Sequence, residues 1–155
     1  MALPSLDEHG FLPEGYHDCS LDDIRETFCY SAERHKLFDL LVQYLDGWRS
    51  SGLKVPIYVD GGFATRKAQE PKDIDVVVDI SQLDLRVSTV TSALHQLLDQ
   101  PSVMQTFRVD VYPYHAGLPV GTNDLRAFFS YVKAPQRLAL GLKEGFRKGL
   151  LRVQI

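Results

Sequence analysis

The sequence predicts an α/β (α+β) fold, in which a mixed β-sheet is flanked by helices and the chain ends in a C-terminal β-hairpin. Runs rich in β-branched residues at 55–60 and 73–80 are typical of buried strands. Apolar residues spaced three and four apart on either side of these runs indicate helices. A chain of 155 residues, 45% of them hydrophobic, can bury one core, so we expect a single domain over residues 1–155.

Composition excludes several classes of protein. The chain contains no run of about 18 apolar residues, so we expect no membrane span. Its first ten residues carry acids and Pro, which is unlike a signal peptide. Cys19 and Cys29 do not have the spacing of a zinc site. We therefore expect a cytoplasmic protein with free thiols.

The N-terminal third predicts an arm followed by two helices. Residues 1–19 include two Pro and two Gly, which favour an irregular N-terminal arm. Ser20 and Asp23 have the spacing of a capping box and predict a short helix to about Cys29. Ser31 is expected to cap a longer helix that ends at Gly52 and buries an apolar stripe of Leu37, Leu40, Leu41, Tyr44, Leu45 and Trp48.

The remaining elements alternate between strand and helix. After the strands at 55–60 and 73–80, residues 82–99 have the apolar spacing of a helix, and Pro101 is expected to act as a breaker. Residues 105–112 alternate as a strand does, with Asp110 and Tyr112 on one face. Thr122 or Asn123 could cap a helix to about Val132. The tail predicts a hairpin that turns near residues 145–149.

Charge is unevenly distributed, although the net charge is only −3. Residues 1–30 hold seven acidic residues and one basic residue, whereas residues 131–155 hold six basic residues and one acidic residue. Two interpretations remain open. The two ends attract each other or are simply solvated, or the basic end binds an anion such as a nucleotide or an RNA backbone.

Three aspartates form a candidate metal site. Asp73 and Asp75 are two residues apart on a predicted strand, so their side chains leave the same face with Cα atoms about 6.6 Å apart. If the strand that carries Asp110 lies beside them, its carboxylate joins the pair. Carboxylate oxygens are the ligands that Mg²⁺ prefers, and Mg²⁺ is usually shared with substrate phosphates. Such a set of acids suits phosphoryl-type transfer.

Gly61 and Gly62 form a candidate phosphate site at the end of a predicted strand. Without Cβ atoms the chain can approach a phosphate closely, and its free N–H groups can form an anion-binding nest. Thr65 and Arg66, with the neighbouring Lys67, are placed to add a hydroxyl and positive charge. The alternative interpretation of the diglycine is a plain turn that ends the strand.

The segment GGFATRKAQEPKDIDVVV contains Gly-Gly, ten further residues and then Asp-x-Asp. It resembles the signature of the nucleotidyltransferase (polymerase-beta-like) superfamily, with a spacing similar to that of the minimal nucleotidyltransferases, including those of toxin–antitoxin operons. The resemblance covers about residues 55–112 and implies a nucleotidyltransferase-like fold. By this resemblance Gly61 and Gly62 contact nucleotide phosphates, Asp73 and Asp75 bind Mg²⁺, and Asp110 is the third carboxylate, which helps to activate an acceptor hydroxyl.

The implied function is Mg²⁺-dependent transfer of an NMP from an NTP, with ATP as the expected donor, to a hydroxyl of a protein or RNA acceptor such as tRNA. A toxin or antitoxin partner would fit the resemblance to operon-encoded members. The alternative is a catalytically degenerate module that binds a nucleotide or a protein, as an antitoxin does. Gly62 stands where many members have Ser, which keeps this alternative open.

Overall fold

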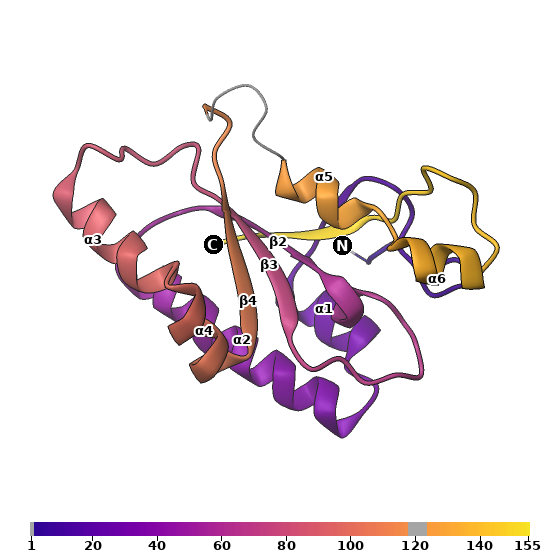
Figure 1. Ribbon diagram of the computed structural model, residues 1–155. Helices are drawn as coiled ribbons and strands as arrows, with labels where there is room; N and C mark the ends of the chain where they lie inside the picture. Colours follow the sequence, from indigo (N-terminus) through magenta and orange to yellow (C-terminus); the bar gives the residue numbers. More distant parts are fainter. Residues whose placement is uncertain (1, 118–123) are drawn as a thin grey trace.

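The computed structural model describes residues 2–117 and 124–155 (Figure 1). Across these residues, five strands form one mixed sheet in the order β1-β5-β2-β3-β4. The strands are β1 (Tyr16–Asp18), β2 (Pro56–Asp60), β3 (Ile74–Asp79), β4 (Val109–Tyr114) and β5 (Leu150–Gln154). The helices are α1 (Leu21–Phe28), α2 (Ala32–Ser51), the short 3₁₀ turn η1 (Gly61–Ala64), α3 (Ser88–Leu97), α4 (Gln100–Phe107), α5 (Leu125–Ser130) and α6 (Ala134–Ala139).

The two faces of the sheet are covered unequally. The long helix α2 runs along one face, where α4 also packs, and α5 lies against the opposite face (Figure 1). Alternate residues of β2, β3, β4 and β5 join the apolar side chains of α1 and α2 in the main core. On the opposite face the described residues form only a small cluster, in which Tyr58, Val77 and Leu150 are buried beneath Leu125 and Phe129. This thinly covered face leaves room for a site.

The N-terminal helices form as the sequence predicts, except that Leu40 of the predicted apolar stripe is only partly buried, whereas Phe38 is buried. Ser20 and Asp23 make both hydrogen bonds of a capping box at the start of α1. Ser31 caps α2, and Gly52 ends it in the left-handed conformation, with φ of 75°. The predicted irregular arm is wrong at Tyr16–Asp18, because this segment pairs in parallel with β5 as a short edge strand. Both ends of the chain therefore belong to one sheet.

The segment 82–114 differs from the prediction. The helix predicted over 82–99 is shorter, since α3 begins only at Ser88. Pro101 does not break a helix but stands in the first turn of α4, where its missing N–H is not needed and Asp99 caps the helix. Arg108 adopts φ of 54° and turns the chain directly from α4 into β4. The predicted strand 105–112 therefore starts later, although Asp110 and Tyr112 do share a face.

The predicted C-terminal hairpin is wrong. Within residues 133–155, all of which the structure describes, the chain forms α6, a turn-rich segment and the single strand β5. β5 pairs antiparallel with β2 and parallel with β1, so its partners come from distant parts of the chain. The predicted caps Thr122 and Asn123 lie outside the described residues, and α5 is capped by Asp124.

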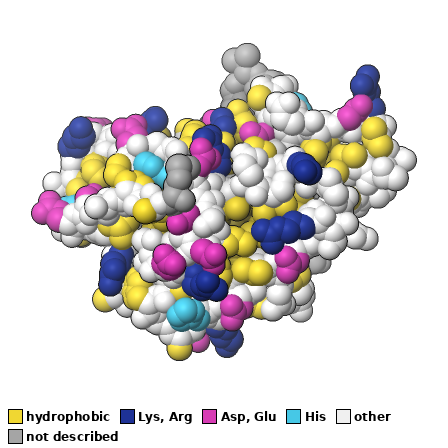
Figure 2. Space-filling view, turned by 180° about the vertical axis from the view of Figure 1, so that it is seen from behind, with side chains coloured by type: hydrophobic (Ala, Val, Ile, Leu, Met, Phe, Trp, Pro, Cys, Tyr) yellow, Lys and Arg dark blue, Asp and Glu magenta, His cyan; other side chains and the backbone are white. Residues whose placement is uncertain are grey.

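The acidic and basic ends of the chain contact each other, as one of the two interpretations predicted. Arg152 donates two hydrogen bonds, of 2.6 and 2.8 Å, to the carboxylate of Asp18, and Arg147 lies 4.0 Å from Glu14. Figure 2 shows one face of the molecule, on which basic and acidic side chains are interspersed.

No helix in the described part of the chain combines the length and apolarity needed to cross a membrane.

Arg34 ties α2 to the loop that follows β2. Its side chain is fully buried and donates hydrogen bonds to the backbone carbonyls of Phe28, Gly62, Phe63 and Thr65 at 2.7–3.2 Å. Its guanidinium also lies 4.4 Å from the centre of the Tyr30 ring. The Tyr30 hydroxyl in turn donates to the carbonyl of Lys67 and accepts from its N–H. The junction of α1 and α2 therefore holds the loop over residues 62–67.

We expect Arg34→Met to lower the free energy of unfolding by about 3 kcal/mol or more, because four carbonyl oxygens lose a charged donor. Urea denaturation measures the change. Arg49→Met is the matched control, since Arg49 lies on the same helix but is exposed and, among the described residues, forms an ion pair with Asp46 alone. It should change stability by less than about 1 kcal/mol. Equal effects of the two substitutions would contradict an anchoring role for Arg34.

Candidate functional site

Three carboxylates stand in a row across the thinly covered face of the sheet. Asp60 at the end of β2 pairs in register with Asp75 on β3, and Asp75 pairs in register with Asp110 on β4. They alternate along their strands with the core-facing residues Val59, Val76 and Val111. The structure thus brings Asp75 and Asp110 together, as the sequence predicts, and adds Asp60.

Asp60 is the most deeply buried of these acids. It is 2% exposed, and burial raises its pKa to about 6 against the opposing effect of Lys148. Lys148 Nζ lies 3.2 Å from Asp60 Oδ1, close enough for an ion pair. Apart from this ion pair, Asp60 Oδ1 has no hydrogen-bond partner among the described residues. Both side chains of the pair are almost completely buried.

Asp75 occupies the centre of the row and is the most strongly perturbed. Burial, followed by the charges of Asp73, Asp60 and Asp110, raises its pKa to about 7, while Lys148 acts in the opposite direction. Asp73 lies one residue before β3. Burial and then the charge of Asp110 raise the pKa of Asp73. The four carboxylates therefore interact electrostatically, and a cation among them would relieve their repulsion.

Asp110 is held by neutral neighbours. Its Oδ2 accepts a hydrogen bond of 2.7 Å from the hydroxyl of Tyr112, and its Oδ1 accepts one from the amide of Gln100. Tyr112 packs against Phe129 of α5, with ring centres 5.3 Å apart. Through these contacts the position of the Asp110 carboxylate depends on α4 and on α5.

Gly61 and Gly62 lie directly beside these acids, at the start of η1. Gly61 has φ of 79°, which favours glycine, and a Cβ atom there would overlap the carboxylate of Asp75. A Cβ atom on Gly62 would overlap only the flexible end of the Lys67 side chain, and would lie in ordinary van der Waals contact with Pro71. The first glycine is therefore required for the close approach of β2 to the Asp75 carboxylate, and the second is less constrained.

The neighbouring residues divide between two sides of the loop. Thr65 is buried, lines the same cavity as the acids, and donates a weak hydrogen bond of 3.4 Å to the carbonyl of Gly61. Arg66 instead lines a separate depression beside the N-terminal arm, and its guanidinium stacks 5.0 Å from the Tyr30 ring. Lys67 is the basic residue of this loop that lines the acidic cavity.

The cavity has a volume of about 800 Å³ and a segregated lining. Acids and the diglycine turn form one part, namely Asp60, Asp75, Asp110, Gly61 and Gly62. Lysines contribute a second part, with Lys67, Lys133 and Lys148. Residues of α5 and the segment after it form an apolar wall of Leu125, Phe128, Phe129, Tyr131 and Val132. Asp73, the remaining acid of the predicted metal site, does not line this cavity.

The lysines form a group that sequence reasoning identified only in part. Burial and then the charges of Lys148, Arg34 and Lys133 lower the pKa of Lys67, so these cations lie close enough to repel. The charge of Lys133 also partly opposes the rise in the pKa of Asp73. Negative charge from a bound anion would be stabilised between them. The excess of basic residues near the C-terminus indicated that Lys133 and Lys148 could bind an anion. It did not indicate that they lie beside the diglycine turn.

The acids have the donor chemistry that Mg²⁺ requires. All of the candidate ligand atoms are carboxylate oxygens, one of them is buried without a hydrogen bond, and Asp75 is destabilised by three like charges. As the side chains stand, no three His, Cys, Asp or Glu residues in the described part of the chain are arranged around a common metal position. Both oxygens of Asp110 are engaged by Gln100 and Tyr112 instead.

Comparison with known proteins identifies the family but not the activity. The model of DUF6932, a family of unknown function, matches residues 4–154. Searches of curated proteins and of solved structures give no match. Because the matched segment includes every strand and helix described above, the chain belongs to the DUF6932 family.

Proposed function

We propose that this protein is a Mg²⁺-dependent nucleotidyltransferase, which moves an NMP from an NTP to a hydroxyl group of a protein or RNA acceptor. The observation that carries the proposal is the row Asp60–Asp75–Asp110, which lies beside the Gly61 turn in a cavity also lined by three lysines. The resemblance of residues 55–112 to the nucleotidyltransferase superfamily supports the same proposal from the sequence.

The cavity combines the two kinds of charge that an NTP and its metal need. Asp73, Asp75 and Asp110 would hold Mg²⁺, which when bound neutralises phosphate oxygens and favours attack at phosphorus. Lys67, Lys133 and Lys148 would bind the phosphates by charge, as would the backbone N–H groups of the Gly61–Gly62 turn. Lys67 thereby takes the part that the sequence suggested for Arg66.

The reaction requires one proton acceptor and a stabilised leaving group. The acceptor hydroxyl oxygen forms a bond to the α-phosphorus, and the bond from that phosphorus to the bridging oxygen of the β-phosphate breaks. Asp110 orients the hydroxyl and accepts its proton, and pyrophosphate leaves toward the lysines. The protein's contribution is positioning and charge stabilisation.

The identity of the acceptor is left to experiment, because a protein and a tRNA both offer suitable hydroxyls. ATP is the proposed donor, and a partner toxin or antitoxin is a proposed acceptor or binding partner. A second candidate function is binding of a nucleotide or protein without catalysis. The engagement of both Asp110 oxygens by Gln100 and Tyr112 favours this second candidate.

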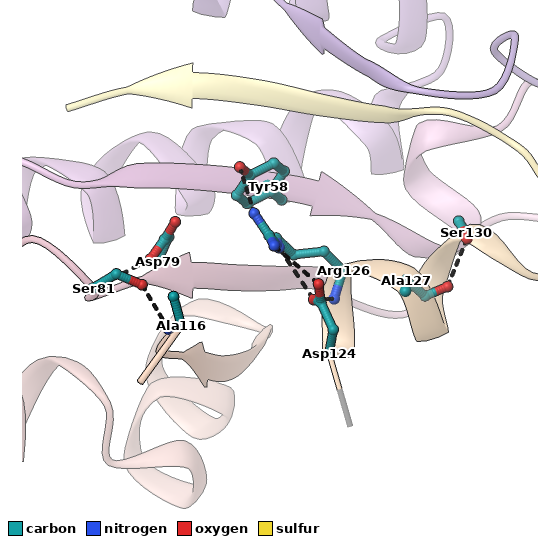
Figure 3. Close-up of polar contacts among 8 residues, drawn as sticks. All are labelled: Tyr58, Asp79, Ser81, Ala116, Asp124, Arg126, Ala127 and Ser130. Atoms are coloured by element: carbon teal, nitrogen blue, oxygen red, sulfur yellow. Dashed lines mark hydrogen bonds and ion pairs between the residues drawn. The ribbon is translucent and has the colours of Figure 1, made fainter. Parts of the chain in front are cut away.

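Substitution of the central acid tests the proposal. We expect Asp75→Asn to lower transfer at least about 100-fold, because an amide cannot supply the same charge to the metal. The assay follows label from NTPs radiolabelled on the α-phosphate into tRNA and into the proteins of a cell lysate. Asp79→Asn is the matched control on the same strand, since Asp79 accepts a hydrogen bond from Ser81 N that an Asn can also accept (Figure 3 draws both residues). Metal-dependent transfer that persists in Asp75→Asn would refute the proposal.

A binding measurement separates the two candidate functions from a loss of folding. Mg²⁺ should raise the Tm of the parent protein, because it binds the folded state, but not that of Asp75→Asn. Without Mg²⁺ the variant should be at least as stable as the parent, since it lacks the repulsion from Asp60, Asp73 and Asp110. Mg²⁺ and NTP binding without any transfer would favour the non-catalytic candidate.

The two glycines should differ sharply in their tolerance of a side chain. We expect Gly61→Ala to lower transfer about 100-fold and to destabilise the fold by about 1–2 kcal/mol, because its Cβ displaces the Asp75 carboxylate and its φ is left-handed. Gly62→Ala displaces only the end of Lys67 and should change transfer by less than about tenfold. Transfer rates and urea denaturation of both variants check this expectation. Equal losses would mean that contact with Asp75 is not the reason for glycine at position 61.

A further inference from the structure

We propose that α5 is a stacking platform for the nucleobase of the bound NTP, that Phe128 is its contact residue, and that the platform accepts all four common bases. This inference rests on the proposed nucleotidyl transfer and adds to it the way in which the donor is recognised. It concerns the apolar wall of the cavity, which the transfer chemistry itself does not use.

The lining of the cavity matches the two ends of a nucleotide. Its charged part, with the diglycine turn and three lysines, suits a triphosphate. The wall formed by α5 and the residues after it is aromatic and aliphatic. Aromatic side chains bind bases by stacking on their faces. A single ligand with an anionic end and a flat apolar end satisfies both parts of the lining.

Phe128 is placed to contact such a ring. It lines the cavity and is 58% exposed, whereas Phe129 turns inward and packs on Tyr112. The rings of Phe128 and Phe129 meet edge to face, with centres 5.3 Å apart and an interplanar angle of 82°. Phe129 therefore supports Phe128 while most of the outer ring stays uncovered. A ligand ring that covered Phe128 would remove apolar surface from water.

The helix that carries Phe128 is fixed to the sheet. Arg126 donates two hydrogen bonds to Asp124, at 2.9 and 3.1 Å, and a third at 3.3 Å to the hydroxyl of Tyr58 on β2 (Figure 3). Its guanidinium also stacks 3.9 Å from the centre of the Tyr114 ring on β4. These contacts join α5 to two strands. The platform is thus positioned before a ligand binds, which limits the entropy lost on binding.

The wall has few groups that could distinguish one base from another. Discrimination by hydrogen bonds needs polar groups that are buried with the ligand. The Tyr131 hydroxyl is already paired with Arg147, and the Gln136 amide, which also lines the cavity, is exposed to water. Recognition by ring faces is tolerant of base identity, since every base has such a face.

Direct binding of Mg²⁺ complexes tests the platform without any need for turnover. The ligands are the Mg²⁺ complexes of ATP, GTP, CTP, UTP and inorganic tripolyphosphate, titrated by calorimetry. The parent should bind each NTP about tenfold or more tightly than tripolyphosphate, and the four NTPs should agree within about tenfold. Phe128→Ala should bind ATP no more tightly than tripolyphosphate, while its affinity for tripolyphosphate stays that of the parent. Phe128→Trp, in contrast to Phe128→Ala, should keep the preference of the parent for ATP over tripolyphosphate, because Trp also offers an aromatic face.

Leu138→Ala is the control, because Leu138 is an equally apolar and exposed side chain on α6, outside the cavity lining. It should bind all of the ligands as the parent does. If Phe128→Ala keeps the full preference for ATP, or if one NTP binds more than about 100-fold tighter than the others, the platform is overturned while the proposed function stands. If the parent binds neither tripolyphosphate nor any NTP in the presence of Mg²⁺, both proposals fail.

Discussion

The buried guanidinium of Arg34 is the constraint on which the candidate site depends. A buried charge is normally paired with an opposite charge, yet Arg34 donates to four backbone carbonyls, three of which belong to Gly62, Phe63 and Thr65 of the loop. Its Nε has no hydrogen-bond partner among the described residues. The loop over residues 62–67 therefore directs these carbonyls toward the core, and its opposite side faces the cavity. A carbonyl that points at Arg34 cannot repel an incoming phosphate. The same bonds keep Gly61 against Asp75, so the helix layer controls the geometry of the opposite face of the sheet.

The row of acids is a second constraint, which acts against stability. Like charges in register on adjacent strands repel each other. Burial first, and then the charges of Asp73, Asp60 and Asp110, raise the pKa of Asp75 to about 7. The fold offsets this repulsion only partly, through the ion pair of Asp60 with Lys148 and the neutral donors on Asp110. A protein that keeps such repulsion in a cavity stores it where a cation can relieve it, and strained sites of this kind are typical of function.

The sequence predicts those parts of the fold that local patterns determine. The capping box at Ser20, the β-branched run of β3 and the stripe of α2 each carry their signal within a few residues. The first two form as predicted, and so does the stripe apart from Leu40, which is only partly buried. The C-terminal hairpin and the role of Pro101 were wrong for a shared reason. A strand's partner and a proline's place in a helical turn depend on what lies around them. β5 finds β1 and β2 more than ninety residues away, which no local pattern reveals.

The candidate site shows the same division between local and long-range information. Asp73, Asp75 and the diglycine could be selected from one short segment, and the parity of Asp110 from its strand. Asp60 was not selected, because an acid at a strand end is usually solvated, and it becomes buried only when β3 and β5 flank β2. Lys148 reaches it for the same reason, since it lies just before β5. The strand order places the C-terminal basic segment beside the diglycine turn. Basic residues that the sequence shows only as an excess near one end of the chain therefore line the same cavity as the acids and the aromatic wall.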